Sequence, residues 1–458
     1  MSENSVDVPQ KKIWTVGTLK YTLPQLLCTA TILLLAKQMM CLVCYSIVPN
    51  VKPIILDGIG ATPTQIALIV STLPNIMNVI LNPILSTWSD KTRTRIGRRT
   101  PFLIWSAPFL ALMLVLIGFH AEGSSLLAKL LPGVQCNWEL WYLGIIILLF
   151  QIGYLFPGTA VYYLEADVIP YKCFGQYMAV GSIVSTLCNA AFSYWLLAFT
   201  VDHLKLTLTI FAVLYVLTYV LQLIFVKEGE YPPVQDKIDK NSSVAQKVVD
   251  YCVMFFRQCF TRKIFIFLSL CTGLNAASNI CRGMFNTLFV TKDLGVDLAT
   301  VGKIGGICGI ITAVCIYFFG RIMDKTHPML IYFLGGIFVM IVNVFGYFFC
   351  WGEKTYFVIA LATSLMYAFQ NLANTPLLVA ILPPDKFGQF CSSNGMVNSL
   401  ALVIGSFLGG IVTTRFGFRV MFVWDFFVTG LATAALIVVY FEWKRFGGKD
   451  NYVPPQVD

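Results

Sequence analysis

The octapeptide PYKCFGQY at residues 170–177 recurs in the same chain as PPDKFGQF at residues 383–390. Two tripeptides are repeated in the same order: Asp90-Lys91-Thr92 as Asp324-Lys325-Thr326, and Leu27-Cys28-Thr29 as Leu270-Cys271-Thr272. The separation between copies narrows along the chain, which we attribute to longer outer loops in the first half, around residues 50–63 and 120–139. Repeats in the same order predict two copies of one structural unit in parallel orientation.

The composition excludes a soluble protein. Of the 458 residues, 57% are hydrophobic and 12% are charged, whereas soluble domains have roughly 45–50% and about 25%. Twelve apolar runs are long enough to cross a bilayer. We therefore expect an all-α membrane protein whose twelve transmembrane helices form two six-helix bundles related by pseudo-twofold symmetry. The expected spans are residues 21–47, 64–86, 101–119, 140–162, 176–200, 206–226, 263–290, 299–320, 329–350, 356–381, 389–413 and 420–441.

The distribution of charge predicts the domain organisation and the orientation. With the N-terminus inside, most Lys and Arg residues lie in cytoplasmic segments, so the positive-inside rule places both termini in the cytoplasm. The first apolar run is too long for a cleavable signal peptide, so we expect it to remain as the first span of a multi-pass plasma-membrane protein. The net charge of +9 then reflects topology, and no nucleic-acid partner is expected. The expected parts are an N-terminal bundle (1–227), a cytoplasmic linker (228–262), a C-terminal bundle (263–445) and a cytoplasmic tail (446–458).

The fourteen cysteines and three histidines do not form a metal-binding pattern. Cys41 and Cys44 have CxxC spacing, but they lie in an apolar run, where cysteine packs as a small hydrophobic side chain. His120, His203 and His327 are far apart in the sequence. No HExxH, GxSxG, Walker or paired-CxxC signature is present. We therefore expect no metal, no cofactor and no enzymatic activity, with a membrane sensor as the alternative outside transport.

The loop SDKTRTRIGRRTPF at residues 89–102 suggests a gate. Gly97 permits a turn, and Pro101 suits the first turn of the next helix. The positive-inside rule alone would explain the arginines of this loop. It would not explain Asp90, which recurs in the second half as Asp324. Two further acids, Glu165 and Asp167, lie at the end of the fourth span. They could relay protons, pair with Lys172 or take part in the gate. The predicted gating residues are Asp90, Arg93, Arg95, Gly97, Arg98, Glu165, Asp167 and Asp324.

With Pro83 upstream, and with residues 164–167 and Pro170 after the fourth span, this loop resembles the glycoside-pentoside-hexuronide:cation symporters and the related sucrose transporters of the major facilitator superfamily. The resemblance implies the fold of that superfamily and sugar transport by alternating access. In the melibiose-type branch, two aspartates before a proline in helix 2 hold the coupling sodium, and Asn78 and Asn82 stand at the matching positions. Neutral amides lack the negative charge that offsets dehydration of the ion. We therefore expect coupling to protons, or none.

The charged side chains inside the expected spans include Lys37, Arg282 and Asp425. Burying a charge in a membrane is costly, so each is a functional candidate. Lys37 and Arg282 lie on repeat-related helices, and both could bind an anionic group such as a uronate or phosphate in a central cavity. The alternative is structural pairing with Glu165 or Asp425. The resemblance also aligns Lys37-Gln38 with a sugar-contacting Lys-Asp pair of melibiose-type members.

Neutral amide side chains are frequent in the expected spans. Asn275, Asn279 and Arg282 follow one another at the spacing of one helical face. Such a stripe suits a ligand rich in hydroxyl groups, although amides also hold helices together. The predicted substrate-binding residues are Lys37, Gln38, Asn78, Asn82, Asn275, Asn279, Arg282, Gln370 and Asn374.

These features predict a secondary active transporter that works as a monomer in the lipid bilayer. Its expected substrate is a small carbohydrate, either a sugar or a glycoside, neutral or acidic. Transport would be driven by protons or uncoupled. The alternatives within transport are an organic-anion or sugar-phosphate carrier that uses Lys37 and Arg282, and a lysolipid transporter, since relatives of the resembled family also handle lipids.

Overall fold

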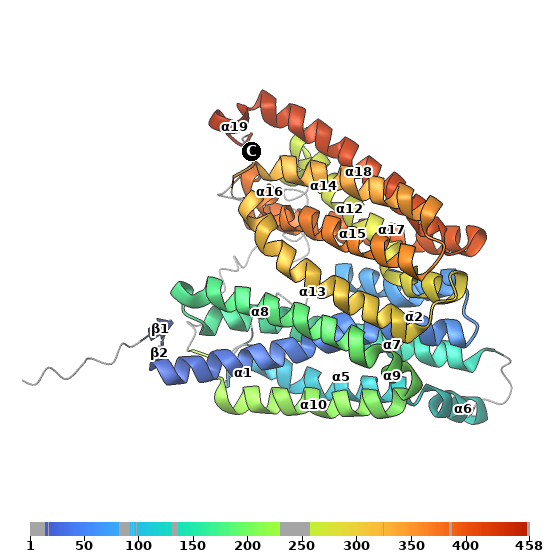
Figure 1. Ribbon diagram of the computed structural model, residues 1–458. Coiled ribbons are helices and arrows are strands. Elements are labelled where there is room, and N and C mark those ends of the chain that lie inside the picture. Colours follow the sequence, from blue (N-terminus) through green and yellow to red (C-terminus); the bar gives the residue numbers. More distant parts are fainter. Residues whose placement is uncertain are drawn as a thin grey trace, which may run out of the picture.

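The computed structural model describes residues 14–16, 18–81, 92, 94, 96–97, 99–130, 136–229, 257–323, 325–383 and 387–455. Within these ranges, twelve helical segments are long and apolar enough to cross a membrane, which confirms the expected all-α membrane fold. The first half of the chain forms the lower group of helices in Figure 1 and the second half forms the upper group. Strand β1 (Trp14–Val16) and helix α19 (Gly448–Asn451) lie at the same end of the molecule, called here the terminal end.

The first half begins with an antiparallel hairpin of β1 and β2 (Leu19–Tyr21) and contains six spans. Three of these spans include a short π-helical stretch, at Leu42–Ile47, Leu68–Thr72 and Phe192–Leu196. The helices are α1 (Leu23–Cys41), α2 (Val48–Gly58), α3 (Pro63–Ala67), α5 (Thr100–Gly118), α6 (His120–Leu130), α7 (Trp138–Val168), α8 (Tyr171–Ala191), α9 (Leu197–Asp202) and α10 (Leu204–Phe225).

The second half contains the other six spans and ends in the short helix α19. A π-helical stretch, Phe289–Asp293, extends its first span. The break at Ala373 divides the tenth span into two helices. The helices are α12 (Lys263–Leu288), α13 (Leu298–Met323), α14 (Pro328–Phe349), α15 (Glu353–Leu372), α16 (Asn374–Ile381), α17 (Phe387–Phe416) and α18 (Val420–Arg445).

The first span is longer than predicted, because the helix continues through Pro49 and Pro53 to Gly58. Pro49 stands in the first turn of α2, where a missing N–H is tolerated. In the preceding π-helical stretch, just before this proline, the backbone hydrogen bonds shift from the spacing of an α-helix to that of a π-helix. The prediction of an outer loop at residues 50–63 was therefore wrong for most of its length, and the extra residues of the first half lengthen a helix. Around residues 120–139, α6 accounts for much of the additional length.

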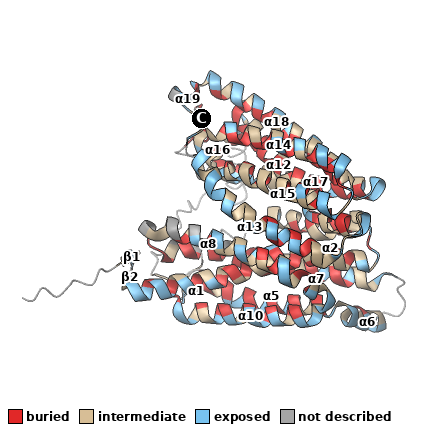
Figure 2. Ribbon diagram, in the orientation of Figure 1, coloured by how far each residue is buried: buried red, intermediate tan, exposed pale blue. Residues whose placement is uncertain are grey.

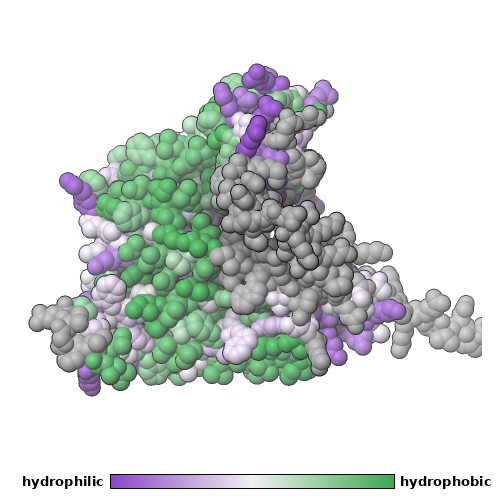
Figure 3. All heavy atoms as spheres, turned by 180° about the vertical axis from the view of Figure 1, so that it is seen from behind, coloured by the Kyte–Doolittle hydropathy of each residue, from purple (hydrophilic) through white to green (hydrophobic). Residues whose placement is uncertain are grey.

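Each bundle buries the faces that its helices turn toward one another. Figure 2 shows buried residues on the inner faces and exposed residues along outer helices such as α10 and α18. Where Figure 3 shows described residues from behind, the middle of the surface is mostly hydrophobic, and hydrophilic residues gather near the edges. An apolar belt of this kind matches the hydrocarbon core of a bilayer.

Side-chain contacts join the two bundles at the end opposite the terminal end. Lys292 Nζ lies 2.5 Å from Asp57 Oδ1, which pairs the first span with the seventh. The hydroxyl of Thr64 lies 2.7 Å from that of Thr414, which pairs α3 with α17. These contacts close the far end of the molecule.

Glycines in α13 and α17 make the bundles approach closely at this end. A Cβ at Gly302 would lie 2.2 Å from the backbone oxygen of Ser193, and one at Gly410 would lie 2.5 Å from the Cβ of Ala67. Only glycine fits such an approach without displacement of a neighbour. From this contact, α8 and α13 diverge toward the terminal end (Figure 1).

Candidate functional site: buried charge pairs and a polar cavity

Most of the predicted gate lies outside the described residues. This applies to Asp90, Arg93, Arg95, Arg98 and Asp324, and also to the predicted binding residue Asn82. Gly97 is described, and its φ of +118° confirms that it forms the turn before α5. Asp167 is half-buried near the end of α7.

Glu228, three residues after the end of α10, binds the beginning of α5. Its Oε1 accepts hydrogen bonds from the backbone N–H of Arg99 (3.0 Å) and of Thr100 (2.6 Å), and from the Thr100 hydroxyl (2.6 Å). A carboxylate at a helix N-terminus satisfies free N–H groups and interacts favourably with the helix dipole. Glu228 therefore links the end of the sixth span to the start of the third, within one bundle. The sequence assigned Glu228 to the linker and gave no sign of this contact.

We expect Gly97→Ala to destabilise the N-terminal bundle. A Cβ at this position would lie 2.4 Å from Cδ of Glu228, and the positive φ disfavours any other residue. The combined strain should cost about 1–3 kcal/mol, visible as a lower melting temperature of the detergent-purified protein. Gly283→Ala, in open space on α12, is the matched control and should leave the melting temperature nearly unchanged. Equal melting temperatures for both variants would contradict this assignment.

Lys37 in α1 forms an ion pair with Glu165 in α7. Its Nζ lies 2.7 Å from Oε2 of Glu165, whose side chain is fully buried. The hydroxyl of Tyr177 in α8 donates to Oε1 of Glu165 at 2.8 Å, and the sulfur of Met178 lies 3.7 Å from Nζ. The pair therefore joins three helices of the N-terminal bundle, and the lysine charge is compensated by a buried acid.

Arg282 in α12 forms an equivalent pair with Asp425 in α18. Its Nη2 lies 3.2 Å from Oδ2 of Asp425, which is fully buried, and 2.5 Å from the side-chain oxygen of Asn343 in α14. The hydroxyl of Tyr367 in α15 donates to the same carboxylate oxygen at 2.5 Å. The guanidinium also lies over the ring of Phe422, 5.0 Å from its centroid. Four helices of the C-terminal bundle meet at this network.

The two pairs share a design but are not repeat-related copies. Each combines a cation on the first helix of its bundle, a buried acid and a tyrosine hydroxyl that donates to the acid. The acids, however, come from the fourth span in one half and the twelfth in the other. Tyr177 ends the repeated FGQ motif, whereas its counterpart Phe390 has no hydroxyl and packs on Phe265 at a ring distance of 4.5 Å. This difference between Tyr177 and Phe390 was the feature of the sequence that could have indicated a polar partner for Glu165.

A further buried cation lies within the first span. Lys52, for which the sequence predicts an outer loop, is part of α2 and its exposed fraction is 6%. It was missed because the first span was expected to end at residue 47. It is a further candidate for binding an anionic group.

The predicted amides fall into different environments. Asn78 and Asn279 are half-buried, and Asn275 is buried. Gln370 is buried in α15. It lies where α15 crosses α14, because a Cβ added to Gly335 of α14 would be 2.7 Å from the Cβ of Gln370. Asn374 follows one turn later at the start of α16, and neither its side-chain oxygen nor that of Gln370 has a hydrogen-bond partner among the described residues.

Gln38 lines a cavity of about 280 Å³ between the first span and α8. Its amide nitrogen donates to the backbone oxygen of Gly181 at 2.9 Å, and its oxygen accepts from the hydroxyl of Ser185. The cavity ends next to Ala190, which contacts α13 of the other bundle. Its polar lining consists of uncharged hydrogen-bonding side chains: Gln38, Tyr45, Ser46, Ser185, Thr186 and Asn189.

Comparison with known proteins supports the fold. The family model for the Major Facilitator Superfamily matches residues 33–369 and 268–454. A bacterial homolog of the human lysosomal transporter Spinster, in an inward-facing and occupied conformation, superposes with a TM-score of 0.68 at 12% identity, covering 94% of this chain and 98% of its own. The nucleoside transporter NupG superposes with a TM-score of 0.59 at 15% identity, covering 92% of this chain and 99% of its own. No curated protein sequence matches significantly.

Proposed function

The chain belongs to the Major Facilitator Superfamily and is therefore a membrane transporter and not an enzyme, and we propose that it carries a neutral sugar or glycoside. The cavity beside Gln38 supports this proposal, because hydroxyl and amide groups line it. A hydroxyl-rich ligand needs such donors and acceptors, and it needs no opposite charge.

The pairing of the membrane charges points the same way. Lys37 and Arg282 each contact a buried carboxylate. Because that carboxylate compensates the positive charge, each cation attracts an anionic substrate only weakly. The acidic substrates that the sequence left open are therefore less well supported than neutral ones. An organic-anion or sugar-phosphate carrier could use Lys52, which is buried in α2.

We assign transport to rocking of two bundles, residues 1–227 and 263–445, joined by a linker (228–262) and followed by a tail (446–458). With both termini in the cytoplasm of a plasma-membrane protein, the far end, where the two bundles contact each other, is the outer side. The pair of Asp57 and Lys292 then closes the outer gate. This arrangement fits alternating access around a site between the bundles.

We further propose that protons drive transport and that Glu165 carries the proton. Glu165 is a fully buried carboxylate, and its partner Lys37 directly precedes Gln38, which lines the polar cavity. Protonation would neutralise the acid and release Lys37, so substrate binding and proton binding could affect each other. Sodium is not expected to couple, because Asn78 and Asn82 stand where the resembled sugar symporters have acids.

Purified protein should be stabilised in a thermal-denaturation screen by neutral sugars or glycosides, and less by uronates, sugar phosphates or lysolipids. Asn189→Ala should then weaken binding of the stabilising sugar about three- to tenfold, the loss of one or two neutral hydrogen bonds. Ser182→Ala, an exposed position one turn before Ser185 on the same helix, is the control and should bind normally.

Stabilisation by uronates or sugar phosphates alone, lost in Lys52→Gln, would favour the anion carrier instead. Stabilisation by lysolipids alone would favour a lipid substrate. A saturable effect of sodium on stability or uptake would contradict proton coupling. Binding that changes signalling without any flux would revive the sensor alternative.

A further inference from the structure

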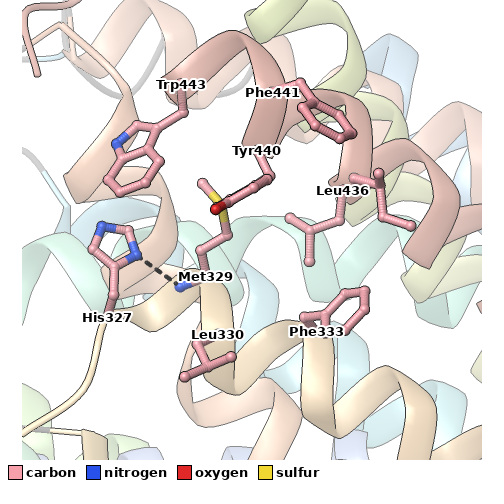
Figure 4. A pocket seen from close by; sticks show the side chains of 9 residues that line it. His327, Met329, Leu330, Phe333, Leu436, Tyr440, Phe441 and Trp443 are labelled. Carbon is pink, nitrogen blue, oxygen red and sulfur yellow. Dashed lines mark hydrogen bonds between the residues drawn. The ribbon is translucent and has the colours of Figure 1, made fainter. Parts of the chain in front are cut away.

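A groove of about 520 Å³ lies between the beginning of α14 and the end of α18, outside the polar cavity and the two charge pairs. Figure 4 shows Leu330 and Phe333 of α14 across from Leu436 and Phe441 of α18. The walls are apolar along nearly their whole length. Leu436 forms part of a buried floor, whereas Leu330 and Phe441 are 51% and 64% exposed. The groove is therefore open on its outer side.

The groove lies at the level where a membrane leaflet meets water. α14 begins at Pro328 and α18 ends at Arg445, so both helices leave the apolar belt at the terminal end. Tyr440 and Trp443 line the groove there, and such residues are typical of the interface between acyl chains and headgroups. The surface around the groove therefore faces lipid.

Cationic side chains gather where the groove reaches this interface. Lys444 and Arg445 end α18, and Lys449 lies in α19, all three exposed. Arg445 is 3.9 Å from Glu442, which offsets its charge. Burial, and next the nearby Lys449, lower the pKa of His327, so that this histidine is neutral at pH 7. The positive charge beside the groove thus comes mainly from the two lysines.

We infer that the groove binds one acyl chain of an anionic glycerophospholipid, whose phosphate is held by Lys444 and Lys449. Water does not fill an apolar space of this size favourably. In a bilayer, the acyl chains of the surrounding lipids are the molecules that reach an exposed apolar groove. The two lysines select among those lipids, because cationic residues near the membrane surface attract anionic headgroups. This lipid occupies the outside of the C-terminal bundle and is distinct from a transported substrate.

The test uses full-length, delipidated protein in detergent. Dioleoyl phosphatidylglycerol should raise the melting temperature in a saturable manner, and dioleoyl phosphatidylcholine should do so only at concentrations about tenfold higher or more, as expected for two headgroup contacts with lysine. Native mass spectrometry of the same samples should show one tightly retained phosphatidylglycerol per chain.

Two variants separate the acyl-chain site from the headgroup site. Leu330→Trp fills the groove and should abolish the saturable effect, whereas Leu431→Trp, at a similarly exposed position of α18, should retain it. Lys444→Gln combined with Lys449→Gln should remove the preference for phosphatidylglycerol, whereas Arg415→Gln at the opposite end should not. These lysines are exposed, so the double variant should fold even if Leu330→Trp does not.

Equal effects of both lipids on the wild type would overturn the inference. Retention of the preference in the double lysine variant would do the same. A protein dimer that dissociates when Leu330 is replaced would show that a second copy covers the groove instead.

Discussion

Arg282→Gln is expected to lower the melting temperature strongly and to reduce uptake of neutral and acidic substrates to the same extent. The change leaves the carboxylate of Asp425 fully buried without its cation. Removing one partner of a buried ion pair costs about 3–5 kcal/mol, which is large compared with the stability of a typical domain. The side-chain oxygen of Asn343 would lose its guanidinium donor as well.

A double variant tests whether the loss of melting temperature arises from the uncompensated charge of Asp425. Arg282→Gln combined with Asp425→Asn removes both charges and should recover much of the melting temperature. Arg415→Gln, at an exposed position of α17, should have little effect. If Arg282→Gln instead leaves the melting temperature unchanged and abolishes only uptake of an acidic substrate, Arg282 binds the substrate anion.

Most of the spans could be placed from sequence because each of them is an apolar run long enough to cross a bilayer. Eleven of the twelve expected spans lie close to their observed positions, and the first begins correctly. Its end could not be predicted, since Pro49 and Pro53 ordinarily indicate a helix terminus. The π-helical stretch before them, which allows the helix to continue, leaves no simple trace in the sequence.

The charged residues of the site could be identified from sequence, but their partners could not. An ionisable side chain in an apolar run is conspicuous, and Lys37, Arg282 and Asp425 were found in this way. Which acid meets which cation depends on how helices distant in sequence pack, and the alternatives of substrate contact and structural pairing were left open. The structure places Lys37 on Glu165 and Arg282 on Asp425, and it adds tyrosines that no charge pattern would reveal.

The polar cavity was predicted only in part, for a related reason. Gln38 was selected because the resemblance aligns Lys37-Gln38 with a sugar-contacting Lys-Asp pair, whereas Ser185 and Asn189 look like ordinary residues of an apolar helix. Serine and asparagine serve equally well as helix-packing groups. Only the packing of the first span against α8 shows that they share a cavity with Gln38.

Glu165→Gln is expected to abolish uphill accumulation driven by a proton gradient while substrate exchange across the membrane continues. Glutamine keeps the size and an acceptor oxygen for Tyr177, but it cannot gain or lose a proton. If Glu165 is the proton carrier, accumulation should fall to the equilibrium ratio. Uptake in proteoliposomes with and without an imposed pH gradient, together with counterflow of labelled substrate, measures the two processes separately.

The variant also leaves Lys37 without its acid, so a loss of stability has to be distinguished from a loss of coupling. Lys37→Met combined with Glu165→Gln removes both charges and should recover the melting temperature but not the accumulation, because recovery of packing does not restore a proton site. Glu139→Gln makes the same substitution at the opposite end of α7 and should accumulate substrate normally. If counterflow is lost together with accumulation in a stable Glu165→Gln protein, Glu165 is needed for conformational change or binding. If the proton gradient still drives accumulation, another group carries the proton, and the pair of Lys37 and Glu165 serves only to hold α1, α7 and α8 together.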